Sequence, residues 1–106
     1  MRSYNCCCQR KVDQKIIPLA GLLKIAGEEN RLKILCILKN GRHCVCEILK
    51  HLKISQSLVS HHLADLKKIG LVFNQKEGQK VYYNLTELGK KLMELLEEIN
   101  KRKEEK

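Results

Sequence analysis

The chain is poor in aromatic residues, in proline and in long apolar runs. Its 106 residues include no Trp, one Phe, three Tyr and one Pro. We therefore expect no aromatic platform on which single-stranded nucleic acid could stack its bases. No stretch approaches the roughly 20 apolar residues that a membrane span needs, and residues 1–15 lack the apolar core of a secretory signal. These absences predict a cytoplasmic protein without a membrane partner, in which thiols stay reduced.

Acidic residues are also in the minority. The sequence has 21 Lys and Arg against 12 Asp and Glu, which gives a net charge of +9. A small chain this basic usually binds a polyanion such as nucleic acid. Apolar residues make up 43% of the chain, enough for one modest core at this length. The composition predicts a single domain and disfavours a multidomain enzyme.

Hydrophobic periodicity, caps and turn signals predict five helices and one β-hairpin. The predicted helices span residues 16–26, 28–39, 45–52, 55–69 and 87–103, and the predicted strands span 72–75 and 80–85. Two short helices joined by a tight turn and followed by a hairpin make a winged helix-turn-helix, a mainly α fold with a β wing (α+β). The expected organisation is a flexible cysteine-containing arm (1–15), this domain (16–103) and a charged tail (104–106).

The helix predicted at 55–69 has two different faces. Its buried stripe comprises Val59, Leu63 and Leu66, with His62 packed beside them, and its exposed face comprises Ser57, Ser60, His61 and Ala64. Short polar side chains of this kind can reach base edges in a major groove. The predicted DNA contacts are Gln56, Ser57, Ser60, His61 and Lys67 on this helix, and Lys76, Gln79 and Lys80 on the wing. The wing lysines would contact phosphate rather than bases.

Four motifs resemble those of ArsR/SmtB-type metalloregulators over roughly residues 16–93. They are Arg31–Leu35 (RLKIL), Cys44–Ile48 (CVCEI), Ser55–Leu63 (SQSLVSHHL) and Gly78–Tyr83 (GQKVYY). The resemblance implies a homodimeric winged-helix repressor that leaves its operator when a metal or metalloid binds. One departure is Glu29, where the family often has Pro, and this affects only a helix cap.

Two of the six cysteines form a Cys44-x-Cys46 pair at the predicted start of the third helix. Side chains two residues apart on a helix diverge by roughly 200°. One ion can take both thiolates only if the first turn opens, or if Cys44 lies at or before the N-cap. In the first case, ion binding would distort the helix that supports the recognition helix.

Two thiolates rarely complete a soft-metal site. The resemblance implies a third cysteine three residues after the pair, where Leu49 stands instead. The remaining candidate ligands are the three adjacent cysteines of the arm, Cys6, Cys7 and Cys8. The arm could extend about 26 Å, enough for a site within one subunit or between two. His43 is a possible fourth ligand, while Cys36 lies in an apolar run and is predicted to be in the core.

The last helix carries apolar residues at spacings of four, three and four. We predict that it forms a twofold dimer together with the apolar first helix. The predicted dimer residues are Leu22, Leu88, Leu92, Leu95 and Ile99. The family that this chain resembles also includes sensors with a metal site of Asp and His residues on the last helix. No histidine follows His62 in this chain. The resemblance therefore favours soft, thiolate-seeking ions over ions that such a site would bind.

Taken with the cysteine pattern, the resemblance implies a DNA-binding repressor released by As(III), Sb(III), Cd(II) or Pb(II), with Zn(II) also considered as the inducer and no organic cofactor. A thiol redox switch on the same scaffold is the alternative, because two neighbouring thiols can oxidise to a disulfide. Three adjacent cysteines in a reduced compartment argue against a disulfide scaffold. A thiol enzyme is disfavoured, since no Cys-His-Asn or Cys-His-Asp arrangement can be assigned.

Overall fold

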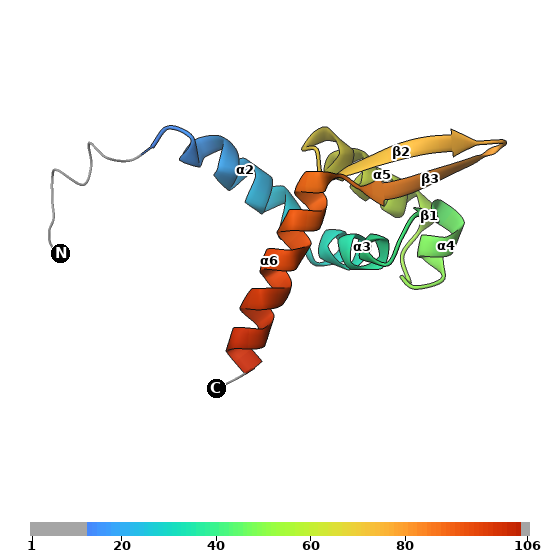
Figure 1. Cartoon of the computed structure of the whole chain (residues 1–106). Helices are drawn as coiled ribbons and strands as arrows, with labels where there is room; N and C mark the ends of the chain where they lie inside the picture. Colours follow the sequence, from blue (N-terminus) through green and yellow to red (C-terminus); the bar gives the residue numbers. More distant parts are fainter. Residues whose placement is uncertain (1–12, 105–106) are drawn as a thin grey trace, which may run out of the picture.

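The structure, a computed structural model, describes residues 13–104. Its elements are α2 (Ile16–Ala26), α3 (Glu29–Lys39), β1 (His43–Cys44), α4 (Val45–Leu49), α5 (Gln56–Lys68), β2 (Val72–Glu77), β3 (Lys80–Leu85) and α6 (Glu87–Glu104) (Figure 1). The winged helix-turn-helix order is confirmed, with α4 and α5 as the helix pair and β2–β3 as the wing. Most of the predicted arm, including its three cysteines, lies outside the described residues.

Side-chain caps fix the starts of three helices. The Ser55 hydroxyl accepts a hydrogen bond from the Leu58 amide at 3.1 Å, and the Thr86 hydroxyl accepts one from Gly89. Glu28, predicted inside the second helix, is instead its N-cap and accepts from the Arg31 amide at 2.9 Å. Such caps satisfy backbone donors that the first turn leaves without partners.

The core lies between α3, α4, α5 and the first residues after α5. Its fully buried large side chains are Ile34, Leu35, Leu38, Ile48, Val59, Leu63, Leu66, Leu71 and Val72. On α3 and α5 these residues recur at helical spacing, which is why periodicity alone located both helices.

The sheet has three strands in the order β1-β3-β2, and the sequence predicted only two of them. In β1, His43 pairs with Tyr83 and Cys44 pairs with Tyr82. A strand of two residues carries no alternation of its own, so it is visible only in the folded chain. The third helix is also shorter than predicted and ends at Leu49, whereas β2 continues to Glu77.

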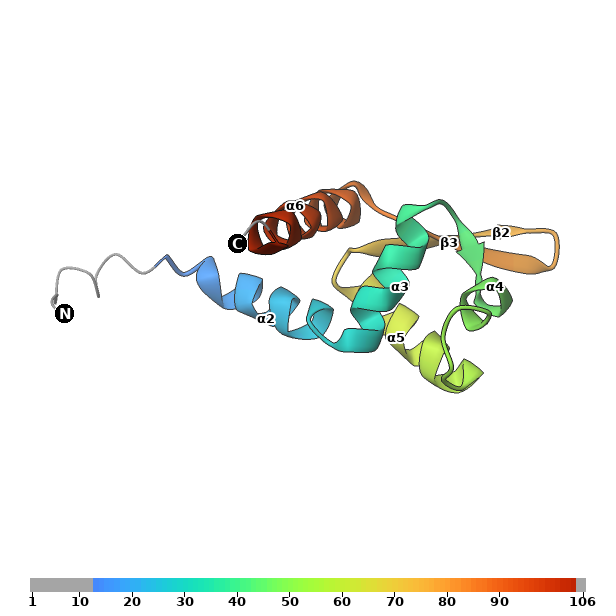
Figure 2. The ribbon, with the colours of Figure 1, turned by 90° about the horizontal axis from the view of Figure 1, so that it is seen from below.

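The wing and the two terminal helices project from opposite ends of the molecule (Figures 1 and 2). Helix α2 buries only Ala26. The exposed large apolar side chains of these helices are Ile16, Ile17, Leu19, Leu23, Leu88, Leu95 and Ile99. Of the other predicted dimer residues, Leu92 packs partly against the core of its own chain, and Leu22 is half-buried. No helix within residues 13–104 is both long enough and apolar enough to cross a membrane.

Candidate metal centre and nucleic-acid interface

Cys44 is the N-cap of α4 and has an extended backbone, with φ −86° and ψ 169°. This geometry lets its side chain turn toward that of Cys46, and the two sulfur atoms lie 3.0 Å apart. The cap is held by Glu47, whose carboxylate accepts a hydrogen bond from the Cys44 amide at 2.9 Å. Of the two geometries that the spacing allowed, the structure has the capped one, so the thiols meet without any opening of α4.

The two thiols differ in their electrostatic surroundings. Cys44 is buried and Cys46 is exposed. The hydrogen bond with the Cys44 thiol lowers the pKa of Cys46, and the charge of Lys80 lowers it further. The same hydrogen bond, together with burial, raises the pKa of Cys44. Cys46 is therefore the thiol that ionises first, and the thiolate is the form that binds metals.

The donor set fits a soft ion but is incomplete among residues 13–104. Two sulfurs on a tetrahedral ion with bonds of about 2.3 Å lie about 3.8 Å apart, so this pair would separate by less than about 1 Å. The described part of the chain contains no group of three His, Cys, Asp or Glu arranged to hold a metal. His43 is thus not assembled with the pair into such a group, and its Nδ1 donates to the Gly41 carbonyl at 2.8 Å. Cys6, Cys7 and Cys8 lie outside the described residues.

A shallow hollow connects the thiols with both predicted DNA-contacting elements. Its lining residues are Cys44, Val45, Cys46, Gln56, Lys80 and Val81. Gln56 is the first residue of α5, and Lys80 is the first residue of β3. The sequence placed these two residues at the DNA and the thiols at a separate site. The structure brings all four together.

The segment that leads into Cys44 is also attached to the wing. The Arg42 guanidinium lies 4.2 Å from the centre of the Tyr82 ring and pairs with the Glu77 carboxylate at 2.5 Å. The Arg42 hydrogen bond lowers the pKa of Glu77. These contacts add to the β1–β3 pairing, so the segment that precedes Cys44 is held to the wing by both backbone and side-chain contacts.

The predicted DNA-facing residues lie at the surface. Gln56, Ser57, Ser60, His61 and Lys67 are exposed on α5, and Lys76, Gln79 and Lys80 are exposed on the wing. The opposite stripe of α5 is buried as expected, and it includes His62.

The prediction for Cys36 was wrong, because this residue is exposed on α3. Ile34, Leu35 and Leu38 fill the inward face of the helix, and Cys36 follows Leu35 by about 100° around the helix axis. Its side chain instead borders a surface hollow together with Lys33, His43 and His51. An apolar run of four residues covers every side of a helix, so the run by itself did not show which residues face inward.

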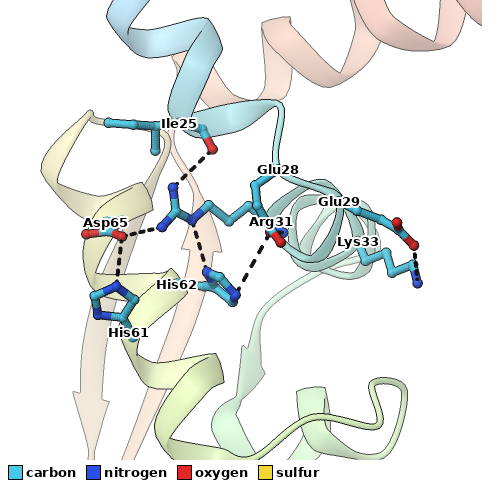
Figure 3. A network of polar contacts seen from close by, with 8 residues as sticks. All are labelled: Ile25, Glu28, Glu29, Arg31, Lys33, His61, His62 and Asp65. Carbon is cyan, nitrogen blue, oxygen red and sulfur yellow. Dashed lines mark hydrogen bonds and ion pairs between the residues drawn. The ribbon is translucent and has the colours of Figure 1, made fainter.

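Sequence reasoning also missed a polar cluster around Arg31 (Figure 3). Arg31 contacts His62 and Asp65 of α5 and a carbonyl of α2. A signal was available, since a histidine within an otherwise apolar stripe needs a buried hydrogen-bond partner.

Comparison with known proteins agrees with this architecture. Residues 28–73 match the family described as bacterial regulatory protein, arsR family. The cadmium resistance transcriptional regulatory protein CadC of Listeria innocua is 41% identical over 80 residues, which cover 67% of this chain and 67% of CadC.

Two solved structures extend the comparison. HlyU from Vibrio cholerae superposes with a TM-score of 0.74 at 38% identity, covering 83% of this chain and 97% of HlyU. The winged helix-turn-helix domain of Mb0332 from Mycobacterium bovis, described as homodimeric, gives a TM-score of 0.78 at 27% identity, covering 90% and 92% of the two chains.

The fold and these similarities define a winged helix-turn-helix DNA-binding regulator of transcription, not an enzyme. Within that class, the chain belongs to the arsR family of bacterial regulatory proteins.

Proposed function

We propose that the chain is a homodimeric repressor that leaves its operator when Cys44, Cys46 and a cysteine of the arm bind a soft metal or metalloid ion. The observation that carries the proposal is the 3.0 Å approach of two thiols inside a hollow lined by Gln56 and Lys80. Thiolates favour As(III), Cd(II), Pb(II) and Zn(II) over hard ions. The similarity to a cadmium resistance regulator supports this ion class.

The thiols would communicate with DNA through the wing. Separation of the two sulfurs shifts Cys44, whose backbone pairs with Tyr82 of β3. A shift of Cys44 that moves the wing would weaken DNA binding, and linkage requires DNA to weaken ion binding by the same factor.

The dimer is supported by the apolar side chains that α2 and α6 leave uncovered. Their exposed fractions of 49–68% are far above those of the core. A twofold pair formed through these helices would present two recognition helices to successive major grooves. The description of Mb0332 as homodimeric supports a dimer, without specifying which helices form it.

The test measures fluorescence anisotropy of reduced, metal-free protein on DNA recovered from a random duplex library. Arsenite, Cd(II), Pb(II) and Zn(II) are titrated separately against the wild type, Cys44→Ser and Cys36→Ser. We expect one ion class to weaken DNA binding by about 5- to 150-fold. Cys44→Ser should abolish the response, whereas Cys36→Ser, which removes an exposed thiol elsewhere on the surface, should retain it. An ion response that survives in Cys44→Ser would contradict the proposed site.

A redox switch at the same pair is the second candidate, because the thiols are already within hydrogen-bond distance. In this reaction the two thiols give two electrons and two protons to a peroxide, which is reduced to water, and a sulfur–sulfur bond forms. Release from DNA by peroxide without added metal, reversed by a dithiol, would favour this function. Release by an ion alone under reducing conditions would favour the metal sensor.

A further inference from the structure

The Arg31 cluster joins three helices at one side chain (Figure 3). Arg31, in the first turn of α3, donates from Nε to His62 Nδ1 at 3.0 Å and from Nη1 to the Ile25 carbonyl at 3.3 Å. Its Nη2 pairs with Asp65 Oδ2 at 2.5 Å. Ile25 belongs to the last turn of α2, while His62 and Asp65 belong to the recognition helix α5.

This cluster is enclosed, unlike the surface ion pairs of the chain. The side chains of Arg31 and Asp65 are 15% and 25% exposed, and His62 is 6% exposed as a residue. Charges that are partly removed from water attract more strongly than exposed ones, and a planar guanidinium holds several acceptors in fixed directions. By contrast, Lys33 and Glu29 on the same helix form an ion pair whose side chains are both exposed to water, and its cation is not a guanidinium.

The surroundings of His62 indicate that the cluster fixes the relative positions of the helices more than it stabilises the fold. Because Nδ1 accepts from Arg31, a neutral His62 carries its proton on Nε2. That atom is buried without a hydrogen-bond partner, and its nearest carboxylate oxygen, on Glu28, is 3.9 Å away. A buried donor without a partner is destabilising, whereas an apolar side chain would fill the same place without that cost. The imidazole therefore contributes a directed contact between Arg31 and α5.

The helices joined by Arg31 have different expected partners. Helix α2 carries exposed apolar side chains for the second subunit, and α5 carries the face for DNA. Asp65 also lies 3.4 Å from His61 Nε2, and His61 is one of the exposed residues of that face. Arg31 thus lies between the dimer surface and the DNA surface and belongs to neither.

We infer that Arg31 is a positioning residue that fixes α5 relative to α2 and so sets the distance between the two recognition helices of the dimer. The inference rests on the proposed dimer, but it does not involve the thiols. A dimer with fixed recognition helices accepts only one spacing between half-sites. Loss of the Arg31 contacts should leave base contacts within each half-site intact and relax the required spacing.

The test compares Arg31→Met, which removes the donors, with Lys33→Met, which removes an exposed charge from the same helix. Each dimer is titrated on the best duplex recovered by the wild type, and on duplexes with one base pair added or removed between the half-sites. All titrations are done at a temperature where circular dichroism shows each variant to be folded. Asp65→Asn is measured in parallel, in case Arg31→Met does not fold.

The wild type and Lys33→Met should bind the altered duplexes about tenfold or more weakly than the best duplex. Arg31→Met should bind all of these duplexes with affinities within about twofold of one another, and Asp65→Asn should discriminate between them less than the wild type does. A further variant, Arg31→Lys, which offers a point charge in place of the planar guanidinium, should restore discrimination only partly. The inference would be overturned if folded Arg31→Met discriminated between the duplexes as strongly as the wild type does. If Arg31→Met does not fold, the same result in Asp65→Asn would overturn it. A wild type that sediments as a monomer or binds no duplex would instead refute the proposed function on which it rests.

Discussion

Helices α5 and α6 carry similar apolar stripes, but only the stripe of α5 is fully covered within the described part of this chain. The stripe of α5 is covered by its own chain, with Val59, Leu63 and Leu66 fully buried. The stripe of α6 is largely uncovered, with Leu95 and Ile99 each more than half exposed. Periodicity therefore predicts that a helix has an apolar face, whereas only the folded chain shows whether that face belongs to the core or to a partner.

The sharpest test of this difference compares Leu63→Ala with Leu95→Ala. Leu63→Ala leaves a cavity in a closed core and should lower the free energy of unfolding by about 2–5 kcal/mol at every protein concentration. Leu95→Ala should change the stability of the monomer little and should weaken the dimer. Urea unfolding at two protein concentrations and sedimentation velocity measure both effects. If Leu95→Ala lowers stability equally at all concentrations, α6 packs only within its own chain.

A second test concerns the attachment of α6 to the body of the domain. Gly89 lies where a Cβ atom would approach the Leu71 carbonyl oxygen to 2.3 Å. That oxygen already accepts a hydrogen bond from the Thr86 amide at 3.1 Å. Gly89→Ala forces the helix away from this contact and should cost about 1–3 kcal/mol, measured by thermal unfolding.

Gly21→Ala is the matched control for this substitution. Gly21 lies in the middle of α2, and a Cβ atom there would meet nothing within 4 Å. Alanine should therefore stabilise the chain by about 0.5–1 kcal/mol, because glycine weakens an open helix interior. Equal effects of the two substitutions would show that α6 does not need the close contact at Gly89.

The sequence predicted the order of the elements because caps and periodicity are local signals. Ser55 and Thr86 act within three residues of themselves, and the stripe of α5 repeats along one helix. Strand β1 could not be predicted in this way, since its pairing with Tyr82 and Tyr83 joins segments about 40 residues apart. The contacts of Arg31 with His62 and Asp65 of α5 also join residues far apart in the sequence, at separations of 31 and 34 positions.

The thiol pair could be predicted only in part. The residue types and their spacing indicated a soft-ion site, and the geometry was left with two possibilities because the exact start of a helix is poorly determined by sequence. The position of Cys44 as the N-cap depends on Glu47 and on the pairing of β1. The proximity of Lys80 depends on the register of the sheet, which no single segment specifies.

The smallest expected effect concerns the two thiols themselves. Because the Cys44 hydrogen bond and Lys80 lower the pKa of Cys46, its reactive thiolate forms at a lower pH than that of Cys44. Iodoacetamide should therefore alkylate Cys46 at a lower pH than Cys44. Mass spectrometry of peptides from reduced, metal-free protein measures the alkylation of each thiol. Lys80→Met should raise the pKa of Cys46 and slow its alkylation at neutral pH.

The effect of Lys80 should be only a few-fold and should fade in high salt, because exposed charges are strongly screened. Lys76→Met is the matched control, since it removes a wing lysine opposite Val81 that does not line the thiol hollow. Equal slowing by both substitutions would show that Cys46 responds to the net charge of the wing. Faster alkylation of Cys44 than of Cys46 would contradict the assignment of Cys46 as the thiol with the lower pKa, and so as the first thiolate available to an incoming ion.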